Sequence, residues 1–229
     1  MAYRLAQISD THLSGDKPLF VASFQRVAEH IAANQPDLVV NTGDLSLDGA
    51  ARTGDLIEAL RLHETLAVSA RYIPGNHDIG DNPDVPVHAG GHSISPERRA
   101  RYLQLFGSDF WYLDVPGWRI VAVNAQLLGS DLPAAGEQLA CITGAVSGAD
   151  DRSIALLVHK PLFHLSASEE AITGRFLNPG PRRQLLGAFG ERLPAMVASG
   201  HVHQYLSLRS AGSEHVWCPS TAFVIPDAQ

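Results

Sequence analysis

The feature that most constrains this sequence is a short apolar run, Leu38 to Asn41, that stops at Gly43-Asp44. The run is typical of a buried strand. It follows a first strand, Leu5 to Ser9, and a helix from about Pro18 to Asn34 whose apolar residues recur at helical spacing. Strand–helix–strand order predicts a parallel pair of strands covered on both faces. Because ligands gather at the carboxyl ends of such strands, Asp44 becomes a candidate site residue.

Four further predicted strands also end in side chains that can bind a metal. Asp10 and His12 are spaced i, i+2 after the first strand, so on an extended backbone they point the same way. The others are Asn76 and His77 after Arg71 to Ile73, His159 after Ile154 to Val158, and His201 and His203 after Ala195 to Ser199. The last two either share one side of an extended backbone or diverge across a turn towards two neighbouring ions.

Each of these motifs is weak alone, since Asp and Asn are ordinary turn residues and His is common in surface loops. Their joint position at five strand ends is not expected of a simple core, because buried charges and imidazoles persist when they are paired or bind metal. Oxygen and imidazole ligands without thiolates favour Mn, Fe, Zn or Co over a structural zinc site.

Several predictions concern the rest of the chain. We expect His63 on the solvated side of a helix, and a long Gly- and Pro-rich loop from residue 79 to 94 that carries His88 and His92. Ser95-Pro96 is typical of a helix start. The other expected elements are hairpins at 110–123 and 205–218, a weak helix at 137–146, a helix through Leu185, and a short strand at Thr221–Ile225.

Composition sets the outer bounds. The chain has 229 residues, of which 45% are hydrophobic, which predicts one domain over residues 1–229. A formal net charge of −7 argues against a nucleic-acid polymer held on a broad basic face. Cys141 and Cys218 are expected to be buried free thiols. With neither a charged leader nor a membrane-length apolar run, the expectation is a cytoplasmic protein that does not interact with membranes.

Taken in chain order, these motifs resemble the signature of the calcineurin-like metallophosphoesterases in every block. The blocks are Asp10-Thr11-His12, Gly43-Asp44, Gly75-Asn76-His77-Asp78, His159 and Gly200-His201-Val202-His203. The spacing is most similar to the small bacterial branch that includes cyclic-nucleotide and glycerophosphodiester phosphodiesterases. The resemblance implies an α/β fold, a four-layer α/β/β/α sandwich of two mixed β-sheets, with a dinuclear metal site.

The resemblance also implies a role for each motif residue. One divalent ion (Fe, Mn or Zn) would be held by Asp10, His12, Asp44 and His203, and a second by Asp44, Asn76, His159 and His201. Asp44 would bridge the two ions together with a hydroxide that attacks phosphorus. Asn76 and His77 would contact the substrate, and His77 would stabilise a phosphoryl oxygen or protonate the leaving group. Asp78 would orient His77 or a ligand.

The implied activity is hydrolysis of small phosphodiesters such as 3',5'-cyclic AMP or glycerophosphodiesters. The alternatives are a phosphomonoesterase with the same site and a non-catalytic interaction module on this fold; a nuclease is disfavoured by the acidic charge balance. Small family members usually continue past the closing strands, whereas this chain stops at Pro226-Asp227-Ala228-Gln229. Either the chain is shortened or a C-terminal hairpin is missing. Whether the protein forms a homo-oligomer stays open.

Overall fold

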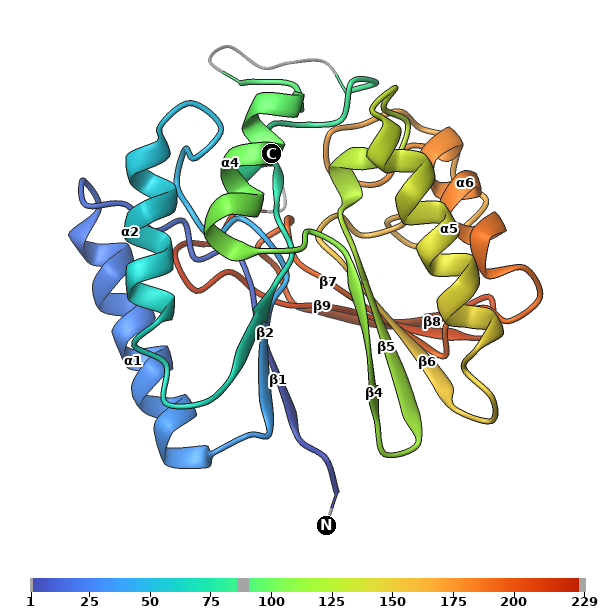
Figure 1. The fold of residues 1–229 in the computed structure, drawn as a ribbon, viewed down its shortest axis with the longest axis horizontal. Helices are drawn as coiled ribbons and strands as arrows, with labels where there is room; N and C mark the ends of the chain where they lie inside the picture. The colour runs from blue at the N-terminus through green and yellow to red at the C-terminus, as the bar shows by residue number, and fades with distance from the viewer. Residues whose placement is uncertain (1, 86–90, 227–229) are drawn as a thin grey trace.

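The computed structural model describes residues 2–85 and 91–226. Two sheets face each other (Figure 1). The smaller sheet has the order β1-β2-β3, and all its pairs are parallel. Its strands are β1 (Leu5–Ile8), β2 (Leu38–Asn41) and β3 (Ala70–Tyr72). The larger sheet has the order β4-β5-β6-β7-β9-β8. Its strands are β4 (Trp111–Val115), β5 (Trp118–Val123), β6 (Ser153–Val158), β7 (Met196–Ser199), β8 (Leu206–Ser210) and β9 (Ser213–Trp217).

Helices form the two outer layers (Figure 1). The smaller sheet packs against α1 (Pro18–Asn34) and α2 (Thr53–His63). Residues of α4 (Pro96–Phe106) belong to the same apolar cluster. The larger sheet packs against α5 (Pro133–Ser147) and α6 (Pro179–Phe189). Two short helices, α3 (Asn76–Ile79) and η1 (Ala125–Leu127), follow strands. The predicted four-layer α/β/β/α sandwich is therefore confirmed.

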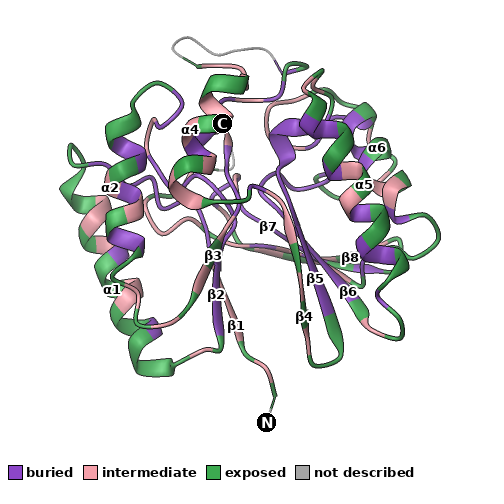
Figure 2. Ribbon diagram, viewed as in Figure 1, coloured by how far each residue is buried: buried purple, intermediate pink, exposed green. Residues whose placement is uncertain are grey.

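The period-2 alternation of strand side chains explains the layers. On β2, Val39 packs into the cluster under α1 and α2, whereas Leu38 and Val40 pack into the cluster between the two sheets. On β6, Leu156 faces the helices and Leu157 faces the opposite sheet. Strands buried on both faces need continuous apolar runs, which is why these runs carried the clearest sequence signal (Figure 2).

The structure adjusts several predictions. In the described residues the smaller sheet is parallel throughout, whereas we expected both sheets to be mixed. The expected weak helix at 137–146 extends over Pro133–Ser147, with Pro133 in its first turn. The strand predicted at Thr221–Ile225 is wrong. There the Ser220 hydroxyl accepts hydrogen bonds from the amides of Ala222 and Phe223, which favours a local turn.

Other expectations have mixed outcomes. Cys141 and Cys218 are free thiols, but both are only partly buried. His88 lies outside the described residues, and His92 is half-buried. None of the helices in residues 2–85 and 91–226 is long and apolar enough to cross a bilayer.

Candidate metal centre

The predicted metal ligands meet at one edge of the sandwich. Parallel strands β1, β2 and β3 in one sheet and β6 and β7 in the other all deliver their carboxyl ends there. The side chains that follow these strands are Asp10, His12, Asp44, Asn76, His77, His159, His201 and His203. Residues nearly two hundred positions apart thereby become neighbours, as the rule for the carboxyl ends of parallel strands predicts.

The ligand atoms form two groups that share one carboxylate. In the first group, atoms of Asp10, His12, Asp44 and His203 lie within 4.8 Å of one another. The second group, within the same limit, comprises Asp44, His159 and His201. Asp44 Oδ2 lies 3.7 Å from His12 Nε2, and Asp44 Oδ1 lies 3.3 Å from His159 Nε2. Asp44 therefore presents one oxygen to each group.

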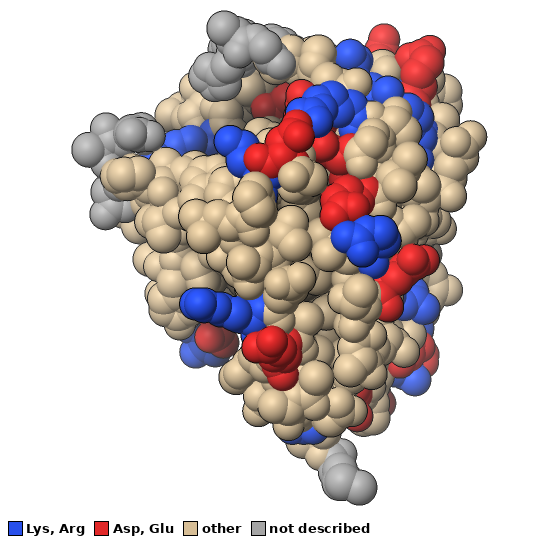
Figure 3. Space-filling view, turned by 90° about the vertical axis from the view of Figure 1, so that its left-hand side faces the viewer, with Lys and Arg blue, Asp and Glu red and all other residues tan. Residues whose placement is uncertain are grey.

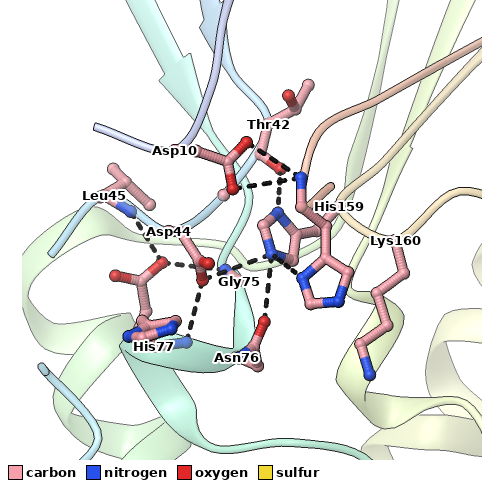
Figure 4. A network of polar contacts seen from close by, with 12 residues as sticks. Asp10, Thr42, Asp44, Leu45, Gly75, Asn76, His77, His159 and Lys160 are labelled. Atoms are coloured by element: carbon pink, nitrogen blue, oxygen red, sulfur yellow. Dashed lines mark hydrogen bonds and ion pairs between the residues drawn. The ribbon is translucent and has the colours of Figure 1, made fainter. Parts of the chain in front are cut away.

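Asn76 joins the second group through its amide (Figure 4). Its Oδ1 lies 3.3 Å from His159 Nε2, and His201 Nδ1 lies 3.2 Å from the same nitrogen. The structure thus brings together every residue that the resemblance assigned as a ligand. That these residues bind metal stays a prediction.

Backbone carbonyls fix the protonation of the imidazoles. His159 Nδ1 lies 2.8 Å from the Thr42 carbonyl, His203 Nδ1 lies 2.9 Å from that of Phe223, and His201 Nε2 lies 2.8 Å from that of Gly174. A carbonyl only accepts, so each of these nitrogens carries the proton and donates. The opposite nitrogen of each ring points into the cluster, and in the neutral ring it carries a lone pair, as in metal-binding histidines.

The inward nitrogens approach one another closely. His12 Nε2 lies 3.0 Å from His203 Nε2, although the hydrogen bond from His203 Nδ1 leaves its inner nitrogen without a proton. His12 Nδ1 is buried without a partner among the described residues. Lone pairs and carboxylates that converge in a buried site repel one another unless a proton or a metal ion lies between them. The donor set therefore fits divalent cations.

The pKa shifts point the same way. Burial raises the pKa of Asp44, but the charges of His159 and His77 outweigh burial and hold it well below its usual range. Burial lowers the pKa of His12 to about 4 and that of His201 to about 3, so both rings are neutral at pH 7, as metal ligands must be. Burial also lowers the pKa of His159, but Asp44 raises it to about 9. The buried carboxylates need positive charge, from a proton on His159 or from a bound cation.

Five of the candidate ligands have a left-handed backbone. The φ angles are +53° at Asp10, +43° at His12, +51° at Asp44, +68° at His201 and +59° at His203. Non-glycine residues rarely adopt such angles, and each costs roughly 1–3 kcal/mol. Strain gathered on ligand residues is typical of functional sites, where the surrounding structure enforces it.

Asp78 connects the loops that carry the ligands. Its carboxylate accepts hydrogen bonds from the amides of Leu45, Ser46 and Gly75 at 3.1, 2.9 and 2.9 Å. Burial, together with the charge of Asp44, raises its pKa to about 6. We expected Asp78 to orient His77 or a ligand. Its contacts place it between the loop after Asp44 and the loop before Asn76, so it positions both loops through their backbone.

His77 faces the open side of the cluster. Its Nδ1 donates to the Leu47 carbonyl at 2.6 Å, and its amide donates to Asp44 Oδ1 at 2.9 Å. Burial lowers the pKa of this ring, but the charge of Asp44 outweighs burial and raises it above the usual value. His77 Nε2 therefore remains available to hold or give up a proton beside the metal ligands.

The cluster opens into a pocket of about 420 Å³. Its walls also contain residues that have no role in the sequence-based prediction: Asp81, Thr173, Gly174, Arg175, Val202, Phe223 and Ile225. Asp81 accepts a hydrogen bond from Lys160, which is fully buried. Apart from Val202, which lies between the motif residues His201 and His203, no motif marks these positions, because they come from loops that only the tertiary fold brings to the site. One signal was present: Lys160 directly follows the candidate ligand His159.

His63 corrects a prediction. We placed it on the solvated side of its helix, but only 1% of it is exposed. Its Nδ1 donates to the Ala59 carbonyl at 2.7 Å, and its Nε2 accepts from Asn41 Nδ2 at 2.9 Å. Asn41 in turn accepts from the Gly43 amide at 3.1 Å. His63 thus supports the turn that precedes Asp44, and helical periodicity alone could not separate such a buried polar contact from solvent exposure.

This burial predicts a pH-dependent stability. Burial lowers the pKa of folded His63 to about 4, below its unfolded value of about 6.5. The neutral ring therefore contributes stability that is complete above pH 6.5 and is lost as the pH falls towards 4. In His63→Gln, which cannot titrate, the free energy of unfolding should lose about 3 kcal/mol less between pH 7 and pH 4 than in the wild type. Urea unfolding at several pH values measures the difference, and parallel pH curves would contradict it.

Comparison with known proteins agrees with this site. The fold and the carboxylate–imidazole cluster fit a metal-dependent hydrolase. A family model for calcineurin-like phosphoesterases matches residues 3–205, and the chain belongs to that family. It is therefore a metal-dependent phosphoric ester hydrolase.

Two bacterial relatives are similar over most of the chain. The 3',5'-cyclic adenosine monophosphate phosphodiesterase CpdA of Pseudomonas aeruginosa is 27% identical, covering 95% of this chain and 75% of the relative. A probable cyclic nucleotide phosphodiesterase of Synechococcus is 28% identical, covering 97% and 82%. Among solved structures, a dimetal phosphatase from Danio rerio superposes with a TM-score of 0.67 at 13% identity, covering 96% of this chain and 88% of that one. That likeness shows the shared fold.

Proposed function

We propose that this protein hydrolyses small phosphodiesters, such as 3',5'-cyclic AMP or glycerophosphodiesters, with two divalent ions bound in the cluster. The carrying observation is the shared carboxylate of Asp44, which presents Oδ1 to one ligand group and Oδ2 to the other. Bound divalent ions would supply Lewis acidity and a water of lowered pKa. The cyclic nucleotide phosphodiesterases among the relatives support the choice of substrate.

The protein's own groups orient and protonate the substrate. Asn76 lies on the same short helix as His77, so the two side chains border the pocket together (Figure 4). His77 faces the pocket, and its raised pKa favours the protonated ring that a general acid for a leaving alkoxide requires. Phe223 and Ile225 cover one side of the pocket with apolar surface and limit the access of water.

Charge distribution favours small substrates over nucleic-acid polymers. On the face shown in Figure 3, Lys and Arg alternate with Asp and Glu and form no continuous basic surface. Together with the net charge of −7, this gives little support to tight phosphate-backbone binding. A phosphomonoesterase with the same cluster is the second candidate, since the ligand groups can hold either kind of ester.

Metal dependence tests the proposal. We expect chelated, dialysed protein to lose its turnover of bis(p-nitrophenyl) phosphate and to regain it when Mn²⁺ is added back. The ratio of diester to p-nitrophenyl phosphate turnover separates a phosphodiesterase from a phosphomonoesterase. The proposal fails if no diester turnover depends on metal, or if the monoester is the better substrate under matched conditions.

A further inference from the structure

Two walls of the pocket lie outside the metal ligands and differ in chemistry. One wall is the loop that contains Thr173, Gly174 and Arg175. The other is the segment that contains Phe223 and Ile225. The first brings a cation and a hydroxyl, and the second brings aromatic and aliphatic surface. A pocket with this division fits a substrate that has an anionic part and a flat apolar part.

The Arg175 loop is fixed although it contains no helix or strand. Thr173 Oγ1 accepts from the Arg175 amide at 2.8 Å, and Asn178 Oδ1 accepts from the Thr173 amide at 2.9 Å. The Gly174 carbonyl accepts from the candidate ligand His201 at 2.8 Å. The residue beside Arg175 is therefore hydrogen-bonded to the cluster of candidate ligands, and these bonds order the backbone that carries Arg175 at the pocket wall.

Arg182 and Glu169 hold the rest of this loop, on either side of residues 173–175. Arg182, which is 3% exposed, donates to the carbonyls of Leu162 and Glu169. The Glu169 carboxylate accepts from the amides of His164, Leu165 and Ser166. Such a loop loses little conformational entropy on binding, as expected of a preorganised recognition element.

Phe223 is fixed in the same way on the opposite wall. Its carbonyl accepts from His203 Nδ1 at 2.9 Å, and its ring lies 4.4 Å from the His203 ring and 5.2 Å from the His12 ring. Phe20 stacks against it at 5.5 Å. Even with these neighbours, 40% of Phe223 is exposed.

Apolar exposure continues beyond this ring. Val224 is 72% exposed and Tyr205 is 71% exposed, and Gln204 donates to the Ile225 carbonyl, which joins the two segments. Single exposed apolar side chains are ordinary, whereas several on neighbouring segments favour a binding surface.

We propose that this pocket selects phosphodiesters of nucleosides over glycerophosphodiesters because Phe223 stacks on the base, while Arg175 donates to a phosphoryl oxygen of either kind of diester. Aromatic side chains stack on every nucleobase, and guanidinium groups match the geometry of phosphate oxygens. The small polar ends of a glycerophosphodiester would gain nothing from Phe223. This inference rests on the proposed phosphodiesterase function and chooses between its two substrate classes.

The first test compares two substrates in manganese-reconstituted protein. For Phe223→Leu we expect the KM for 3',5'-cyclic AMP to rise about tenfold, because stacking is lost while an apolar side chain remains. The kcat/KM for glycerophosphocholine should stay within about twofold, since the backbone bond to His203 is kept. Tyr112→Leu is the matched control: Tyr112 is a 49% exposed aromatic residue on β4, outside the pocket, and neither substrate should respond.

The second test addresses Arg175. Because both substrates carry a phosphodiester, Arg175→Ala should lower kcat/KM for both by about tenfold or more, and Arg175→Lys should recover part of the loss. Arg183→Ala removes an exposed arginine on α6 that pairs with Glu170, and it should leave both values unchanged. An Arg175→Ala variant with unchanged kinetics would overturn the role of Arg175.

A binding measurement separates this inference from the proposed activity. We expect adenosine, which has no phosphate, to bind the metal-loaded wild type in calorimetry and to bind Phe223→Leu about tenfold more weakly. Equal adenosine affinity in the two proteins, or a wild type that prefers glycerophosphocholine to cyclic AMP, would overturn the inference. If the wild type cleaves no diester, but Phe223→Leu binds adenosine more weakly than the wild type does, the proposed activity is overturned. The base-binding role of Phe223 then remains supported.

Discussion

Asp44→Asn is expected to lose both metals and to lower kcat/KM by about a thousandfold or more, since metal ions supply several kcal/mol of transition-state stabilisation. The substitution keeps the shape of the side chain but replaces one carboxylate oxygen with an amide nitrogen. Each oxygen of Asp44 faces a different ligand group, so one of the groups loses its acidic ligand. The lost negative charge weakens both groups, because the second group contains no other carboxylate and the first retains only that of Asp10. Elemental analysis of the purified variant and steady-state kinetics measure the two effects.

His77→Ala is the control for this prediction. His77 contacts Asp44 through its amide, which the substitution retains, and its ring is absent from both ligand groups. Metal content should therefore stay near that of the wild type while kcat falls by about a hundredfold, as expected for loss of a general acid. Equal metal loss in Asp44→Asn and His77→Ala would contradict the separate roles of the two residues.

Gly200→Ala is expected to be nearly as damaging, for a steric reason. A Cβ at this position would lie 1.9 Å from Ser9 Oγ and 2.5 Å from Asp10 Oδ2. Both neighbours are fully buried, and Asp10 also accepts from the His201 amide. Relief of the clash must displace Asp10 or His201, so we expect loss of metal and a fall in activity of about a hundredfold, with about 1–3 kcal/mol lost in stability.

The matched control for Gly200 is a glycine that has open space. Around a Cβ at Gly187, within α6, there is no heavy atom in contact distance. Gly187→Ala should leave activity unchanged and raise stability by up to about 1 kcal/mol, because alanine is the better helix former. Thermal unfolding and metal analysis of both variants test the pair, and a Gly200→Ala protein with full metal content would refute the steric argument.

The elements marked by a regular pattern of apolar residues could be predicted from the sequence. Apolar runs identified β2 and β6, because a strand buried on both faces has few polar positions. The polar residues that end these runs, such as Asp44 and His159, could be located because the ends of parallel strands meet at one edge. The clustering of the ligands therefore followed from position and residue type.

The two pocket walls that contain Arg175 and Phe223 could not be predicted, because no local sequence pattern defines them. Arg175 lies in an irregular loop that is oriented by Asn178 and Arg182, and that orientation depends on contacts across the fold. Phe223 was placed in a strand because its neighbours are β-formers, but the hydroxyl of Ser220 competes for the backbone amides. The left-handed backbone of the ligands is likewise absent from a sequence of ordinary Asp and His residues.

The hydrogen bonds of residues 220–225 have a practical consequence for handling the protein. The Ser220 hydroxyl donates to the carbonyl of Asp10 at 2.7 Å, and the Phe223 carbonyl accepts from His203. Residues 220–225 thus contact two candidate ligands, Asp10 and His203, whereas β1 begins at the opposite end of the sandwich (Figure 1). Labels and surface attachment should therefore avoid residues 220–225, because these residues hold the backbone of Asp10 and the ring of His203 in place.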